Sequence, residues 1–275
     1  MFHFSQGKTM ALKFSFLGSG SRGNCTLVES DQWKFLIDLG FSLRQTSETL
    51  RYCQTGIENL SAAIITHTHD DHIKKSTVKR LASSNVTLFC RNEHESRIGN
   101  WEGFKLLREK HLVRPYADNS FEMLPGVTVQ PIAVSHDSPA THGFVFDFKT
   151  GNSQFRFVYA ADCGFPSTDA ISKFIPDADL VALEFNHDEE MERRSGRPWF
   201  LINRVLGPQG HLSNRSAANL LGKTKSKKLR GVVQLHLSRD CNRPDLAMTE
   251  AQNTLGSLPV HQTAQDTIGP IINIA

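Results

Sequence analysis

The chain has 275 residues, of which 39% are hydrophobic and 21% charged, values typical of a globular protein with a sizeable core. No apolar run approaches the ~20 residues that a membrane-spanning helix needs, and the first residues lack the apolar stretch of a secretory signal. The five scattered cysteines form no CxxC pair, so they fit neither a disulfide framework nor a thiolate zinc site. We therefore expect a cytoplasmic protein without membrane association.

Charge is unevenly distributed, although the formal net charge is only +3. Residues 145–190 contain nine acidic and three basic side chains, whereas residues 191–245 contain three acidic and twelve basic ones. Within this basic stretch, clusters lie at 193–197 and 223–230. Such a stretch is either a solvated surface or a rim that attracts a polyanion, and composition alone leaves both interpretations open.

Segments rich in β-branched and aromatic residues alternate with helical patterns along the chain. In the first half, the patterns predict strands at 13–18, 25–30, 33–38, 62–66 and 86–90, and helices at 42–51 and 74–84. In the second half, they predict strands at 127–134, 143–149, 154–162, 179–185 and 231–237, and helices at 213–223 and 244–256. Ser213 is a suitable N-cap, and the last helix has a proline near its start and a glycine at its end. Residues 92–120 show no clear pattern.

Strand-rich blocks interspersed with helices favour a layered α/β sandwich over a parallel sheet of βαβ units. The sequence shows no internal repeat, low-complexity tract or linker, so we predict a single domain over residues 11–275. Residues 1–10 end at a second potential start, Met10, and are predicted to be a ragged extension outside the fold.

Four potential metal ligands fall within six residues, directly after a predicted buried strand. His67 and His69 are two residues apart, so in extended chain they point to the same side and can share one metal ion. Asp71 and His72 lie past the bend toward the next helix and can face a second ion. Imidazole and carboxylate are ligands expected for zinc, iron or manganese. Three histidines and an aspartate at this spacing are hard to explain as packing.

The run at 67–72 resembles the HxHxDH signature of metallo-β-lactamase-fold hydrolases, and later motifs follow in the order of that family. The resemblance implies a four-layer αβ/βα sandwich with two divalent metal ions, zinc or manganese. It implies that Asp162 bridges the two ions and that Asp38 orients the ligand histidines. The complete implied ligand set is His67, His69, Asp71, His72, His136, Asp162 and His236.

Shorter motifs are similar to those of the YycJ/WalJ exonuclease group, which is related to ribonuclease Z. In chain order they are LGSGSRGN, LEFNHD, GHLSN, HLSRDCN and AQDTIG. This similarity implies a phosphodiesterase acting on nucleic acid, specifically a 5′-directed DNA exonuclease with a metal-bridging hydroxide as nucleophile. The implied catalytic residues are Asp71, His211 and Glu184, with Glu184 holding the imidazole of His211 beside the scissile phosphate.

The 73 residues between Asp162 and His236 are too few for the domain that ribonuclease J inserts there, which favours a compact enzyme. The basic stretch at 193–230 is then expected to contact much of the DNA backbone. Three alternatives stay open: a small-molecule or cyclic phosphodiesterase, a thioester or lactam hydrolase, and a non-catalytic binding module. The intact ligand set disfavours the last. Residues 18–21 could either cradle a phosphate or form a tight turn.

Overall fold

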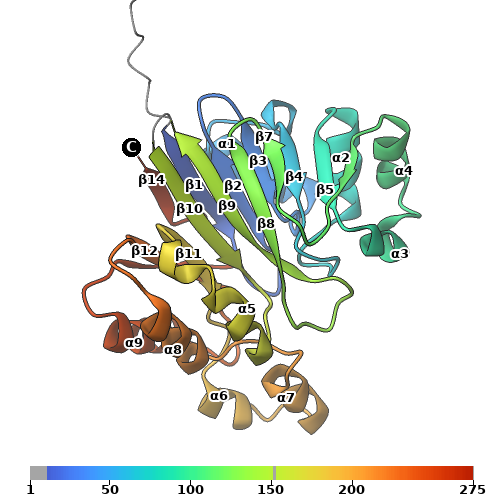
Figure 1. Cartoon of the computed structure of the whole chain (residues 1–275). Helices are drawn as coiled ribbons and strands as arrows, with labels where there is room; N and C mark the ends of the chain where they lie inside the picture. Colours follow the sequence, from blue (N-terminus) through green and yellow to red (C-terminus); the bar gives the residue numbers. More distant parts are fainter. Residues whose placement is uncertain (1–10, 151–152, 275) are drawn as a thin grey trace, which may run out of the picture.

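The computed structural model describes residues 11–150 and 153–274, which form two sheets flanked by helices (Figure 1). The first sheet contains β1 Leu12–Gly18, β2 Cys25–Glu29, β3 Lys34–Ile37, β4 Ala62–Ile64, β5 Thr87–Cys90, β6 Val113–Pro115 and β14 Ile271–Ile274. The second contains β7 Phe121–Leu124, β8 Val127–Ala133, β9 His142–Thr150, β10 Ser153–Ala160, β11 Leu180–Glu184, β12 Gly231–Leu235 and β13 Val260–Gln262. The strand orders are β14-β1-β2-β3-β4-β5-β6 and β13-β12-β11-β10-β9-β8-β7.

Helices flank the two sheets. They are α1 Leu43–Tyr52, α2 Lys75–Ser83, α3 Glu95–Ile98, α4 Glu102–Glu109, α5 Thr168–Ser172, α6 Glu189–Arg193, α7 Trp199–Leu206, α8 Asn214–Thr224 and α9 Pro244–Leu255. Of these, α6 and α7 lie at the lower end of the molecule in Figure 1. Short 3-10 turns occur at Ile57–Asn59, Asn92–His94, Phe165–Ser167 and Ile175–Asp177. Leu81 of α2 and Phe104 of α4 belong to the apolar cluster on the first sheet, and Leu221 of α8 and Ala251 of α9 to that on the second. The predicted four-layer αβ/βα sandwich is therefore confirmed.

An aromatic core holds the two sheets together. The ring centroids of Phe14 on β1 and Phe157 on β10 are 4.9 Å apart, and those of Phe35 on β3 and Phe146 on β9 are 5.5 Å apart. All four side chains are fully buried. Tilted or edge-on aromatic pairs contribute about 0.5–1.5 kcal/mol each beyond the area they bury. This packing fixes the position of one sheet against the other, and with it the separation of the loops at their ends.

Strand direction determines where those loops meet. In the first sheet β3 pairs in parallel with β4. In the second, β11 pairs in parallel with both β10 and β12. The carboxyl ends of parallel neighbours lie at the same edge of a sheet, which is where open α/β sheets gather functional groups. The residues that follow β4, β10, β11 and β12 are therefore brought together.

Every predicted strand and helix is present, with ends shifted by at most two residues. The unassigned segment at 92–120 contains α3, α4 and β6, elements too short to show a period. Helices of one or two turns are marginal alone and form through packing, as the burial of Phe104 and Leu107 on α4 shows. The extension predicted at residues 1–10 lies outside the described residues. None of the helices within 11–150 and 153–274 has the length and apolar character needed to cross a bilayer.

Candidate metal centre

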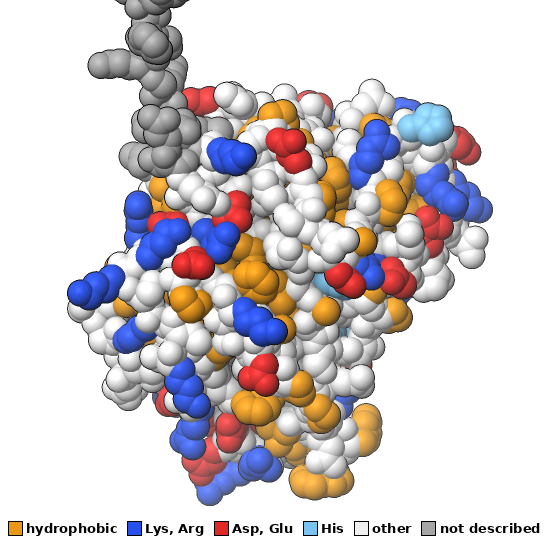
Figure 2. All heavy atoms as spheres, in the orientation of Figure 1, with side chains coloured by type: hydrophobic (Ala, Val, Ile, Leu, Met, Phe, Trp, Pro, Cys, Tyr) orange, Lys and Arg blue, Asp and Glu red, His pale blue; other side chains and the backbone are white. Residues whose placement is uncertain are grey.

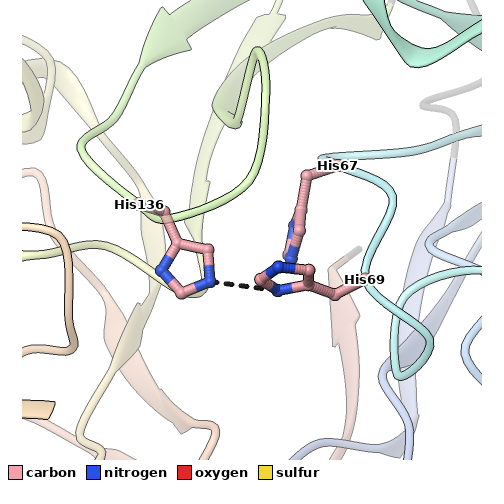
Figure 3. A group of neighbouring side chains, drawn as sticks. All are labelled: His67, His69 and His136. Atoms are coloured by element: carbon pink, nitrogen blue, oxygen red, sulfur yellow. Dashed lines mark hydrogen bonds between the residues drawn. The ribbon is translucent and has the colours of Figure 1, made fainter. Parts of the chain in front are cut away.

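Three histidines converge between the two sheets (Figure 3). His67 and His69 follow β4, and His136 follows β8 of the opposite sheet. One ring nitrogen from each lies within 4.8 Å of the others, and His136 Nε2 is 3.3 Å from His69 Nδ1. His67 is fully buried, and its Nε2 has no hydrogen-bond partner among the described residues. A buried imidazole nitrogen left unpaired is costly, so this donor set fits a metal ion.

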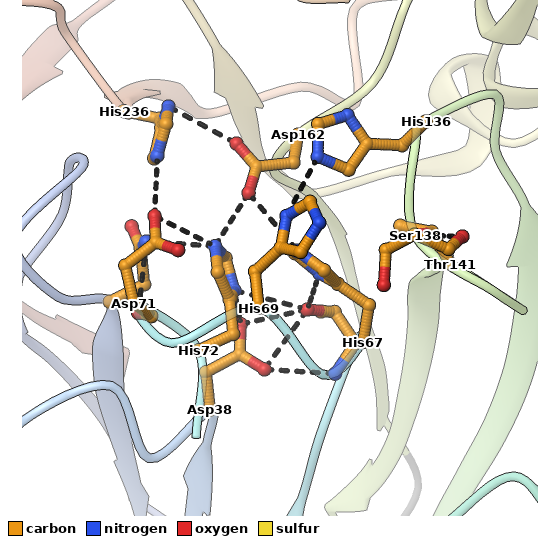
Figure 4. A network of polar contacts seen from close by, with 12 residues as sticks. Asp38, His67, His69, Asp71, His72, His136, Ser138, Thr141, Asp162 and His236 are labelled. Atoms are coloured by element: carbon orange, nitrogen blue, oxygen red, sulfur yellow. Dashed lines mark hydrogen bonds and ion pairs between the residues drawn. The ribbon is translucent and has the colours of Figure 1, made fainter. Parts of the chain in front are cut away.

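A second group adjoins the first and consists of Asp71, His72, Asp162 and His236, again with ligand atoms within 4.8 Å of one another. Asp162 Oδ2 lies 2.6 Å from His72 Nε2 and 3.5 Å from His67 Nε2 (Figure 4). Asp71 Oδ2 lies 3.4 Å from His236 Nε2. All seven residues of the implied ligand set are therefore brought together, and one carboxylate contacts both groups.

Three site residues adopt a left-handed backbone. The φ angles are 63° at Asp38, 49° at Asp162 and 56° at His236. Each residue stands just past the end of a strand, namely β3, β10 and β12. This conformation costs a non-glycine residue roughly 1–2 kcal/mol, and such strain clusters at functional sites. Here the left-handed residues break the strand direction at the point where their side chains enter the space between the sheets.

Asp38 orients His72. The carboxylate is fully buried and accepts the backbone N–H of Thr66 at 2.8 Å. Its Oδ2 lies 2.8 Å from Nδ1 of His72. A carboxylate on one ring nitrogen fixes the tautomer and aims the other nitrogen, as is usual behind metal-binding histidines. In this structure the aimed nitrogen, Nε2, faces Asp162.

The ionisation states of His67 and Asp162 suit cation binding. Burial lowers the pKa of His67 well below its usual range, and the neighbouring His72 lowers it further, so the ring is neutral. Burial raises the pKa of Asp162, but His236 and His72 outweigh that effect and hold the pKa well below its usual value. Neutral imidazole and ionised carboxylate are the forms that bind divalent metals.

Glu184 and His211 form a pair beside the second group. Glu184 ends β11 and is fully buried, with Oε1 2.7 Å from His211 Nδ1. Its Oε2 accepts the backbone N–H groups of Cys163 and Leu212 at 2.9 and 3.0 Å. Burial opposes ionisation of Glu184, but His211 lowers its pKa to about 2. Burial also opposes protonation of His211, but Glu184 and Asp162 raise its pKa well above the usual range.

A cavity of about 410 Å³ opens over both groups. Asp71, Asp162 and His211 line it, together with Arg197 and residues of α7. A second cavity, of about 460 Å³, lies between α6, α8 and α9 and contains none of the predicted ligands. The first cavity is therefore the one that gives access to the ligand groups.

Asp137 is a site residue that the sequence did not single out. Its Oδ1 lies 3.3 Å from His136 Nε2 and 3.6 Å from His69 Nε2. Its Oδ2 accepts from Arg204 Nε of α7 at 2.5 Å. Its position directly after His136 was the available signal. Asp137 connects the first ligand group to α7.

Two residues of the loop between β1 and β2 form hydrogen bonds with the backbone of proposed metal ligands. Asn24 donates its N–H to the carbonyl of Asp71 at 2.7 Å, and its side-chain nitrogen lies 2.9 Å from His72 Nε2. The hydroxyl of Ser19 accepts the N–H of His236 at 2.9 Å and donates to Asn24 Oδ1 at 2.8 Å. Both side chains are buried. The chain turns at 20–23, where Gly23 donates its N–H to the carbonyl of Gly20 at 2.9 Å, and Ser19 and Asn24 on either side support the second ligand group.

The basic side chains of residues 193–230 do not all line the cavity. Arg197 and Arg204 line the cavity. The cluster at 223–230 precedes β12, whereas His236 follows it, so the strand separates the two by about 16 Å. In that cluster Lys228 Nζ lies 3.2 Å from Asp179, at the start of β11. The length and direction of one strand place these charges at the far end of the sheet.

Comparison with known proteins gives a consistent result along the chain. The Beta-lactamase superfamily domain matches residues 34–232. Exodeoxyribonuclease YycJ of Bacillus anthracis is 30% identical over 252 residues, covering 90% of this chain and 90% of its own. Exodeoxyribonuclease WalJ of Streptococcus pneumoniae serotype 2 (strain D39) is 29% identical over 280 residues, covering 96% and 99%. The metallo-β-lactamase fold protein YhfI of Bacillus subtilis superposes with a TM-score of 0.66 at 19% identity, covering 97% and 100%.

Proposed function

The chain belongs to the beta-lactamase superfamily, and we propose that it is a metal-dependent phosphodiesterase that removes nucleotides from the 5′ end of DNA. The observation that carries this proposal is the site itself, in which two His/Asp groups share Asp162 beside the Glu184–His211 pair under one cavity. The relatives named as exodeoxyribonucleases support the substrate class, because they align along nearly the whole chain.

We assign the two ligand groups to two divalent ions, zinc or manganese. The first would be held by His67, His69 and His136, and the second by Asp71, His72 and His236, with Asp162 between them. When bound, the ions supply an activated water and neutralise charge on a phosphoryl group. The nitrogen and oxygen donors of this set serve zinc and manganese alike.

The side chains beside the ligands bind and orient the substrate. His211 faces the cavity and is positioned to donate a hydrogen bond to a phosphoryl oxygen, or a proton to the leaving oxygen. Glu184 holds this ring through Nδ1, which leaves Nε2 for the substrate. Arg197 and Arg204 also line the cavity. Each is paired with a carboxylate, and both add positive charge for the phosphate backbone of the strand.

The test is a time course on end-labelled duplex and single-stranded DNA, with metal-stripped protein resupplied with Mn²⁺ or Zn²⁺. We expect metal-dependent shortening from the 5′ end, absent in Asp71→Ala. Asp70→Ala is the matched control, because this neighbouring carboxylate is exposed and pairs with Arg97 at 3.2 Å. In the same assay, His211→Ala should lower turnover about 10²–10⁴-fold with metal content retained.

Each contrary result is informative. Shortening from the 3′ end would reverse the proposed direction. Hydrolysis of a small diester without cleavage of DNA would keep the metal centre and make the protein a small-molecule phosphodiesterase. Unchanged turnover in His211→Ala would remove that residue from the mechanism.

A further inference from the structure

Two exposed aromatic side chains stand on the helix that walls the cavity. Trp199 and Phe200 begin α7 and are 68% and 74% exposed. Leu201, Arg204 and Val205 of the same helix line the cavity. Hydrophobic side chains gather over α7 at the lower right of Figure 2. Adjacent exposed aromatics beside a functional cavity are the kind of apolar surface that marks a binding site.

Helix geometry places these rings relative to the cavity. Residues four apart are neighbours on a helix surface, so Phe200 lies next to Arg204 at the edge of the cavity-lining face. Trp199 lies about 100° further round, on the side away from Leu201. The aromatic surface therefore begins at the cavity mouth and continues outward over the helix. Arg204 marks the boundary between the two.

We propose that Trp199 and Phe200 form a stacking platform for nucleobases of an unpaired DNA strand entering the cavity. The inference rests on the proposed function and adds the part of the substrate that α7 binds. Grooves that hold single strands combine basic side chains for the backbone with aromatic faces for successive bases. Here Arg204 and Phe200 provide that combination within one helical turn. The cluster at 223–230 cannot replace it, because β12 places that cluster at the other end of the sheet.

A second copy of the chain is the alternative partner for this aromatic surface. Two aromatic side chains bury at most about 500 Å² of each copy. A stable interface buries about 800 Å² of each partner. The platform alone is too small for a dimer, whereas two rings match the scale of one or two bases.

The test compares DNA with a small diester in the metal-loaded enzyme. Trp199→Ala combined with Phe200→Ala should raise the KM for single-stranded DNA at least about five-fold, because each stacked base contributes substantially to affinity. Hydrolysis of bis-(p-nitrophenyl) phosphate should be unchanged, since this diester is too small to reach from the metals to the platform. Phe200→Trp should retain the low KM and Phe200→Leu should lose it. Tyr52→Ala is the matched control, because this ring on α1 is also 68% exposed but does not line the cavity.

A spectroscopic readout is independent of turnover. Of the three tryptophans, Trp33 is buried and Trp101 half-buried, which leaves Trp199 as the exposed fluorophore. Adding a single-stranded oligonucleotide should quench the fluorescence, and Trp199→Phe should lose most of that quenching.

The outcomes separate the two proposals. An unchanged KM in the double variant, with DNA still cleaved by the wild type, overturns the platform alone. An equal loss on the small diester shows damage to the site and also overturns it. A change in oligomeric state without any change in DNA affinity assigns the rings to a second copy. Failure of the wild type to cleave or bind DNA overturns the proposed function and the platform with it.

Discussion

A single buried carboxylate, Asp38, determines how the second ligand group is presented. Asp38 lies at the end of β3, and its carboxylate hydrogen-bonds to Thr66 and His72 of the loop after β4. Removing it would leave Nδ1 of His72 with only the Thr66 hydroxyl, at 3.2 Å, inside a buried region. The ring could then turn, and Nε2 would no longer point reliably toward Asp162.

Asp38→Ala should therefore weaken metal binding about 10–100-fold, the usual effect of deleting a carboxylate behind a ligating histidine. Chelator competition with Mn²⁺ or Zn²⁺ measures this affinity directly. Asp70→Ala is the control, since Asp70 lies in the same run but its side chain is 77% exposed and pairs with Arg97. Equal affinities in Asp38→Ala and the wild type would show that His72 is held by other contacts.

The helix α7 and the segment before β12 place basic side chains at opposite ends of the second sheet. Arg204 of α7 lines the cavity, whereas Lys227 is exposed in the cluster at 223–230. Of these two side chains, only Arg204 lines the cavity over the proposed metal site. Net charge alone gives both side chains the same weight in attracting DNA.

Arg204→Gln should weaken DNA binding and lower the slope of log Kd against log salt by about one, whereas Lys227→Gln should leave the slope nearly unchanged. Anisotropy titrations of a labelled oligonucleotide at several salt concentrations give both slopes. Metal content must be measured in Arg204→Gln, because its partner Asp137 lies 3.3 Å from His136 Nε2. An equal decrease of the slope in both variants would mean that bound DNA also contacts the cluster at 223–230.

The proposed metal centre lies between the two sheets of the sandwich. The loop after β4 in the first sheet supplies four of the proposed ligands, and the second sheet supplies His136, Asp162 and His236. Ions held there would tie the two sheets together in addition to the aromatic core. A ligand that binds only the folded state stabilises it by mass action.

Metal at 100 times its Kd should raise the free energy of unfolding by about 2.7 kcal/mol per site. Thermal unfolding of metal-stripped protein, with and without added Mn²⁺ or Zn²⁺, measures the change. Asp162→Ala should lose most of this stabilisation, because that carboxylate contacts both groups.

We also propose that residues 11–275 form one domain, which requires a single cooperative unfolding transition. Two separate transitions would contradict that assignment.

Local sequence patterns were sufficient to predict the longer strands and helices and the histidine-rich run of the site. Strands and helices of several turns were predictable, because their side-chain periods are properties of neighbouring residues. The run at 67–72 was recognisable for the same reason, since its spacing after a buried strand already places His67 and His69 on one side. Short elements such as α4 and α7 were missed, because their stability comes from packing rather than from a period.

The way in which distant residues combine depends on the packing of the two sheets. The contact of Asp162 with His67 and His72, and the support that Ser19 gives to His236 from 217 residues away, depend on how the two sheets pack. The same holds for the basic side chains, of which Arg204 reaches the cavity while the cluster at 223–230 does not. These relations join residues far apart in the chain. No local pattern encodes the distance or angle at which the packed sheets bring them together.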